Sequence, residues 1–341
     1  TDPLIHHGRH FGRSVYAFAN VHALLLAGIN ADEDVAPETQ QYIFIFIFPT
    51  AGSNEPHTSR ERRELRIFRQ LLRLVPNLED RLMECSEEEL MSVANMIQKG
   101  ASGARSDDTK TLKGAIIDWL VEPGGPPLSP QLSRNVKINR GFNHDRTGFL
   151  LCPPDLEWND ENIRQQLRDK QIVVTGSHWP IFVYQNEKFD PDQPWKGLFR
   201  GRLLVQGFKH IFTCPSSVDE DPRATRSGNA RIHGMTQVTR ASIAYVATQV
   251  RFALTAASTF SRSDRETDSE TFYTSVLEVL EDPEEQDEVK ELMGWWNQKI
   301  FPSFSTTRRL APTNSILSRL KQRRAAMAQK ELGTDEPAST S

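Results

Sequence analysis

Apolar residues recur every three or four positions through much of the chain, which is the spacing of helices that bury one face. The pattern is strongest over residues 240–256, where Ile243, Val246 and Val250 share a stripe and most other positions are apolar too. Thr239 directly precedes this segment and can cap a helix through its hydroxyl. A helix that is apolar nearly all round belongs in a core, so we predict a central buried helix here.

Other segments predict helices with distinct polar faces. Residues 59–74 combine leucines at helical spacing with six arginines that are expected to face outward. Ser86 and Glu89 form a capping box for a helix that is expected to end at Gly100. The polar cluster at residues 107–109 is expected to cap a further helix.

Two stretches between Asn135 and Tyr184 predict short strands instead. Residues 135–153 and 172–184 each place β-branched and aromatic residues on both sides of a polar bend. Residues 42–48, with the sequence YIFIFIF, also alternate as a buried strand does, although no neighbouring segment offers a partner strand. We therefore predict a mainly α fold of about ten helices with a few short β strands, and an α+β arrangement stays open.

Changes in composition divide the chain into four parts. A segment rich in proline and glycine suits a linker, and a basic C-terminal segment rich in Ser, Thr and Pro suits a poorly ordered tail. The predicted parts are a helical region at 1–122 with an insertion or mobile loop at 42–58, a linker at 123–134, an α+β region at 135–304 and a tail at 305–341.

Charge and cysteine content narrow the class of protein. The 341 residues carry a formal net charge of −4, whereas dedicated nucleic-acid coat proteins are strongly basic. Cys85, Cys152 and Cys214 are too widely spaced for a disulfide framework or a zinc module. No apolar run reaches the ~18 residues of a membrane span, and no signal-peptide pattern opens the chain. We expect an intracellular protein, cytoplasmic or nuclear, with no membrane partner and no cofactor.

The polar loop before the predicted central helix contains no Asp or Glu. It places Arg223, Arg226, Arg231 and His233 around a Ser-Gly-Asn turn, and a group of cationic side chains at a turn is typical of an anion-binding site. Two interpretations stay open. The loop binds a phosphate or a nucleic-acid backbone, or its arginines pair with the acidic residues at 266–291.

Four residues are candidates for catalysis, but structural roles explain them equally well. Asp107, Asp108, His144 and Asp145 could hold a metal or exchange protons. Carboxylates at a helix start also satisfy free N–H groups, and adjacent side chains such as His144 and Asp145 rarely face one another. The chain has no GxxxxGK[ST], GxGxxG, GxSxG or HExxH motif. We therefore assign no catalytic residue and no metal site.

Several long strings in the chain resemble one known family. They are HGRHFGR, KGASGARSDDTKTLKGAIIDWL, SRNVKINRGFNHDRTGFLLCP, ATRSGNARIHGMTQVTRASIAYVATQVRFAL, DSETFYTSVLEVLEDPEE and WWNQKIFPSF. In this order they resemble a family of unknown function expanded in mushroom-forming (basidiomycete) fungi, from Leu4 to Phe304. Residues 42–57 depart from it and look like an insertion, such as a translated intron. The resemblance implies a fungal, intracellular protein and transfers no catalytic residue.

These observations favour a non-enzymatic binding protein whose arginine-rich loop holds a phosphate-bearing ligand, nucleic acid included. One alternative is a metal-dependent phosphoryl or phosphodiester enzyme that uses the aspartates and histidine named above. The other is a helical scaffold that binds a protein partner and whose charges are structural.

Overall fold

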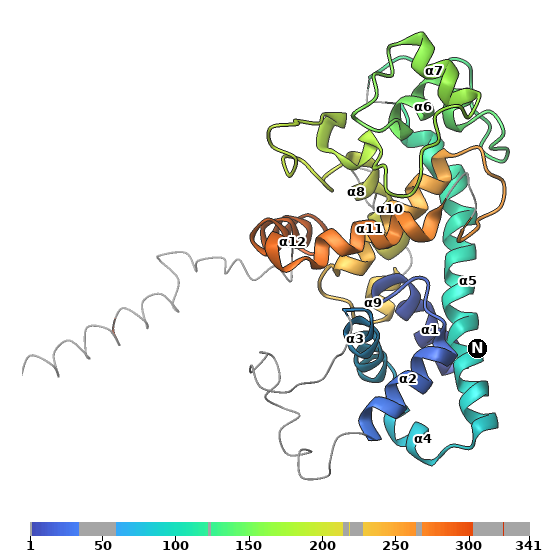
Figure 1. The fold of residues 1–341 in the computed structure, drawn as a ribbon, viewed down its shortest axis with the longest axis vertical. Helices are drawn as coiled ribbons and strands as arrows, with labels where there is room; N and C mark the ends of the chain where they lie inside the picture. The colour runs from blue at the N-terminus through green and yellow to red at the C-terminus, as the bar shows by residue number, and fades with distance from the viewer. Residues whose placement is uncertain are drawn as a thin grey trace, which may run out of the picture. The chain divides into compact units, whose positions relative to one another are not determined.

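A computed structural model describes residues 2–33, 59–121, 124–213, 228–263 and 268–302, together with the single residues 218 and 323. Contacts group the chain into two units, residues 1–301 and 302–341, and nearly all described residues belong to the first. The described residues form twelve α-helices with short 3-10 turns and one π-helical turn (Figure 1). The strand predicted at residues 42–48 lies outside them, and the four-part domain division stays a prediction.

Helix α5, Glu87–Trp119, is the longest of the described helices at 33 residues. It begins as predicted, because Ser86 and Glu89 form the reciprocal hydrogen bonds of a capping box. It does not end at Gly100, and the cluster at residues 107–109 continues the helix instead of capping a new one. The two helices predicted here are one, since the small residues after Lys99 contact another helix rather than turn the chain.

Helix α1, Pro3–Ser14, packs along α5 through glycines on both helices. A Cβ atom on Gly8 would lie 2.2 Å from the carbonyl oxygen of Ile97, and one on Gly100 would lie 2.2 Å from that of Ile5. Real Cβ atoms do not approach backbone so closely. The two backbones can touch only because these positions lack side chains.

Three further helices surround α1 and the first half of α5 (Figure 1). Their apolar faces build one core, to which Phe11 and Ile97 contribute from α1 and α5. The arginine-rich helix predicted at residues 59–74 is confirmed as one of them. The three are α2, Val21–Glu33; α3, Ser59–Leu74; and α4, Leu78–Glu84.

Helix α10, Arg240–Leu254, crosses the second and larger core. Thr239 caps it as predicted, in a reciprocal pair of hydrogen bonds with Ser242. Every residue from Ala241 to Leu254 is buried, which confirms the central helix. It packs against α5, against α8, Arg202–Phe208, and against α11, Ser269–Glu281.

The prediction of β strands is wrong for the described residues, which contain no strand, and the α+β alternative falls with it. In the first predicted stretch, the ring of His144 accepts a hydrogen bond from the Arg146 amide and caps helix α6, Asp145–Leu151. In the second stretch the apolar residues form the 3-10 turn η3, Ile181–Val183. All three of its residues are buried in the larger core. The apolar run therefore reflects a turn enclosed by helices, and not a strand.

The remaining elements are short apart from α12, which follows α11 after a tight turn at Pro283. They are η2, Gly141–Asn143; α7, Glu161–Arg168; η4, Gln185–Glu187; η5, Lys209–Thr213; α9, Asn229–Ile232; η7, Pro283–Glu285; and α12, Gln286–Ile300.

One buried carboxylate ties three helices together. Asp108 of α5 accepts two hydrogen bonds from Arg13 of α1, each 2.7 Å long, and one of 2.6 Å from the hydroxyl of Tyr245 of α10. Arg13 is 2% exposed and Asp108 is 5% exposed. Burial acts to lower the pKa of Arg13, but its hydrogen bonds and its attraction to Asp108 raise that pKa on balance. Because an unpaired charge is costly in such a place, the two helices that carry this pair must assemble together.

The far end of α10 is held by two buried basic side chains, and burial together with the charges of Arg140 and Lys113 lowers the pKa of Lys137 to about 6. Lys137 donates to the carbonyl oxygen of Phe252 at 2.5 Å, and Arg140 donates to that of Ala253 at 2.8 Å. A positive group beside the last carbonyls of a helix is favoured by its dipole, and the guanidinium of Arg140 occupies this position. These contacts fix the C-terminal end of α10, while Asp108 fixes its first half.

We expect Gly100→Ala to lower the free energy of unfolding by about 1–3 kcal/mol, because the added methyl group must push two backbones apart. Gly294→Ala in α12 is the matched control, since a Cβ atom there would meet nothing within 4 Å. That change should stabilise the protein by about 0.5–1 kcal/mol through helix propensity. Urea unfolding measures both, and equal effects at the two glycines would contradict the close contact.

We expect Asp108→Asn to lower the free energy of unfolding by about 3–5 kcal/mol, because it leaves the buried charge of Arg13 without its counterion. The neighbouring Asp107 pairs with Arg9 at the surface, so Asp107→Asn should change stability by less than about 1 kcal/mol. Chemical denaturation of both variants gives the comparison. A small effect at Asp108 would show that the buried pair does not hold the helices.

Candidate anion-binding pocket

A pocket of about 400 Å³ opens where α10 begins, and α1 and α3 form its other walls. Three arginines line it, namely Arg66 and Arg73 from α3 and Arg240 from α10. Glu281, the last residue of α11, is the only carboxylate among its lining residues. The lining therefore carries more positive than negative charge.

The single carboxylate of this pocket is already engaged. Glu281 accepts a hydrogen bond of 2.5 Å from Arg66 and lies 3.3 Å from the Nε atom of Arg63. Arg240 donates to the side-chain oxygen of Gln286 at 2.8 Å and so keeps its full positive charge. Arg73 makes no hydrogen bond or ion pair within the described part of the chain. Two guanidinium groups thus face the pocket without a carboxylate partner among these residues.

The start of α10 adds unpaired backbone donors. The hydroxyl of Thr239 accepts a hydrogen bond from the Ser242 amide at 3.0 Å. The amides of Arg240 and Ala241 have no acceptor among the described residues, and both residues line the pocket. The first N–H groups of a helix carry the positive end of its dipole, so these two favour an anion.

A histidine from α1 completes the polar wall. His10 lines the pocket, is 6% exposed and has an Nδ1 atom without a hydrogen-bond partner in the described structure. Its ring stacks on His233 at a centroid distance of 4.5 Å, and His233 stacks on His6 at 4.1 Å. A buried polar atom without a partner is uncommon in folded proteins, so Nδ1 is a donor or acceptor that a ligand could satisfy.

His10 and His233 are neutral at pH 7. Burial lowers the pKa of His10 to about 4, with a further contribution from the charge of Arg13. Burial also lowers the pKa of His233 to about 3, and the neighbouring His10 and His6 add to this effect. The positive charge of the pocket therefore comes from its arginines alone.

Hydroxyl groups fix two walls of the pocket to each other. Ser14 donates to the carbonyl oxygen of His10 at 2.7 Å, and Thr239 donates to that of Ser14 at 2.6 Å. The second bond joins the end of α1 to the start of α10. Because both hydroxyl hydrogens are used in this way, their role is to position the walls.

The predicted anion-binding loop meets this pocket at one end. Arg223 and Arg226 lie outside the described residues, and Arg231 is an exposed residue of α9. His233 directly follows α9 and stacks on His10, which lines the pocket. Anion binding by these four residues stays a prediction.

The four candidates for catalysis have separate structural partners. Asp107 pairs with Arg9 at 2.6 Å, and Asp108 is the buried carboxylate described above. The Nε2 atom of His144 lies 2.8 Å from the Pro130 carbonyl oxygen, and Asp145 lies 3.4 Å from Arg168. None of the four lines the pocket, and within the described residues no group of three or more His, Cys, Asp or Glu side chains could hold a metal ion.

Sequence reasoning missed the arginines of α3 as pocket residues. It recognised six arginines on that helix and interpreted them as a solvated face. What it could not supply is the long-range packing that brings Arg66 and Arg73 to the start of α10. The arginines of both segments are visible in the sequence, but only the fold shows that the two segments lie close together.

Fold and pocket together define a helical protein with a cationic pocket at a helix start. The chain belongs to DUF6698, a family of unknown function, whose family model matches residues 99–301. No curated protein and no solved structure matches the chain. The matched span begins inside α5 and includes α10, whereas α1 and α3 precede it. Among the described helices, none combines the length and apolar character that a membrane crossing requires.

We expect the free energy of unfolding to fall as the pH drops from 6.5 towards 4. In this range His10 takes up a proton in the unfolded chain but stays neutral in the folded protein, because burial lowers its pKa to about 4. The loss assignable to His10 is at most about 3 kcal/mol. His10→Phe keeps a stacked ring and removes the titration, so its stability should depend less on pH. Denaturation of both proteins at several pH values measures the difference, with His22→Phe on α2 as the control. Parallel curves for wild type and His10→Phe would contradict the buried neutral state.

Proposed function

We propose that this protein is a non-enzymatic binding protein that holds the phosphate group of a ligand in the pocket at the start of α10. One observation carries the proposal. The amides of Arg240 and Ala241 and the guanidinium of Arg73, none of which has a partner among the described residues, line the same pocket.

Phosphate oxygens match this set of donors. A helix N-terminus supplies converging N–H groups and a favourable dipole, and arginine supplies two parallel donors in one plane. The carboxylate of Glu281 does not cancel this charge, because it is shared by Arg63 and Arg66. A dianionic group would therefore accept hydrogen bonds from donors that have no acceptor within the described part of the chain.

The size and the apolar wall of the pocket indicate a small ligand. A volume of about 400 Å³ lies in the usual range of small-molecule sites. Val15, Leu74 and Met235 line it beside the charged groups. We infer a small phosphorylated molecule with an apolar portion, and a nucleic-acid backbone is the alternative source of the same phosphate chemistry.

The scaffold interpretation accounts for other arginines in the described residues. Arg262 pairs with Glu270 at 2.7 Å, and Arg146 pairs with Glu187 through two nitrogens. These pairs connect segments of the fold and need no ligand. Arg73 differs from them because no carboxylate lies opposite it in the described structure.

We expect inorganic phosphate to bind the full chain with a millimolar Kd, and Arg73→Gln to weaken binding about tenfold, the loss of one charge-assisted contact. Sodium chloride should weaken binding too, because the interaction is electrostatic. Calorimetric titration with phosphate and with sulfate measures both effects.

Arg69→Gln is the matched control, since Arg69 lies one turn earlier on α3, is exposed and does not line the pocket. Equal losses in the two variants, or no phosphate binding by the wild type, would overturn the proposal. A single-stranded oligonucleotide that binds equally well to wild type and Arg73→Gln would assign nucleic acid to another surface.

A further inference from the structure

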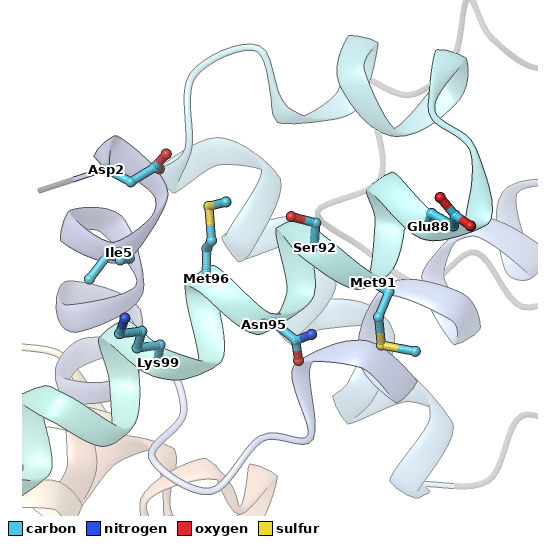
Figure 2. A pocket seen from close by; sticks show the side chains of 8 residues that line it. All are labelled: Asp2, Ile5, Glu88, Met91, Ser92, Asn95, Met96 and Lys99. Atoms are coloured by element: carbon cyan, nitrogen blue, oxygen red, sulfur yellow. The ribbon is translucent and has the colours of Figure 1, made fainter.

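A second feature lies on the exposed face of α5, where a shallow groove of about 500 Å³ runs along the helix. Six of its lining residues belong to α5 and recur at helical spacing, so they share one face. Figure 2 shows them along the helix, with Ile5 of α1 and Asp2, which precedes α1, beside one end. We call these six the α5 stripe: Glu88, Met91, Ser92, Asn95, Met96 and Lys99.

The α5 stripe is self-complementary when its direction is reversed. Its midpoint falls between Val93 and Ala94, and its residues form three pairs equally distant from that point. Two copies of α5 packed antiparallel about this midpoint would place a carboxylate opposite an ammonium group at each end. The three facing pairs are Glu88 with Lys99, Met91 with Met96, and Ser92 with Asn95.

We propose that a second copy of this chain docks on the α5 stripe, with the two α5 helices antiparallel across a two-fold axis. A two-fold interface joins the same patch on both subunits, which is the arrangement that this symmetric pattern fits. The two ion pairs are identical by symmetry and fix the register of the helices.

Five of the six residues of the α5 stripe are exposed, and Met96 is half-buried. Met91 is 43% exposed, and methionine adapts readily to a facing surface. Glu88 and Lys99 form no ion pair with any described residue. Asp2, the other acid beside the groove, already caps α1 by accepting from the Leu4 amide at 2.8 Å. The charges at both ends of the stripe are therefore available.

The area of such a contact sets its strength. One helix face buries less than the ~1,200–2,000 Å² of a stable interface, so the dimer should be weak. We expect a Kd of about 10–100 μM at low salt, with the protein monomeric when dilute. The stripe shares no residue with the anion-binding pocket, so this inference does not depend on the proposed function.

Charge reversal in the full chain tests both the surface and the register. Sedimentation velocity from about 1 to 300 μM should show dimerisation of the wild type, a range that spans the expected Kd. Glu88→Lys and Lys99→Glu should each weaken it about tenfold, because like charges then face each other. The double variant Glu88→Lys, Lys99→Glu exchanges the charges and should restore the wild-type Kd to within about threefold.

Glu87→Lys is the matched control, because it changes the same charge in the same turn of α5 but lies outside the stripe. It should leave dimerisation unchanged. Met91→Asp should abolish dimerisation without loss of helix content, since Met91 is exposed in the folded chain.

Several results would overturn the proposal. They are a monomeric wild type at about 300 μM, which exceeds the expected Kd of about 10–100 μM, equal effects of Glu87→Lys and Glu88→Lys, or failure of the double variant to recover. A dimer that survives Met91→Asp would equally place the interface on another surface.

Discussion

The buried pairing of Arg13 with Asp108 is the interaction on which the position of the candidate pocket at the start of α10 depends. Arg13 fixes the end of α1 against the middle of α5, and Tyr245 brings α10 to the same carboxylate. The carbonyl oxygen of Ser14, the next residue of α1, accepts a hydrogen bond from the hydroxyl of Thr239 at the start of α10. Walls that are held in this way before a ligand arrives lose little conformational freedom on binding, which favours affinity.

The close approach of α1 also determines what α5 presents to its surroundings. Contact at Gly8 and Gly100 leaves no space for side chains, so α1 covers the face of α5 around Gly100. Apolar residues of α5 such as Val93 and Ile97 then fill the first core. The α5 stripe lies on the face of α5 away from this core. Its polar ends, with two methionines between them, suit a surface that is exposed to solvent in the monomer and buried in the proposed dimer.

Local chemistry in the sequence predicted much of the fold. The caps at Ser86 and Thr239 were predicted from a few adjacent residues, because a cap depends only on its own turn. The prediction of strands was wrong because the apolar run at Ile181–Val183 is enclosed by helices that are far away in the sequence. Hydrophobic periodicity does not show such contacts. The pocket was missed for the same reason, since Arg73 and Arg240 meet only after the whole chain has packed.

Arg73 has no carboxylate partner among the described residues because α11 ends at Glu281. Arg63 lies 3.9 Å from Glu278 and Arg66 lies 2.5 Å from Glu281, so successive turns of α3 meet successive turns of α11. Two turns beyond Arg66, Arg73 would need another acidic turn of α11 opposite it. The helix instead stops at Glu281, because Asp282 is extended and a proline follows. The last arginine of α3 therefore passes the end of its partner helix and lines the same pocket as Arg240 and Ala241 at the start of α10, where no carboxylate of the described residues pairs with it.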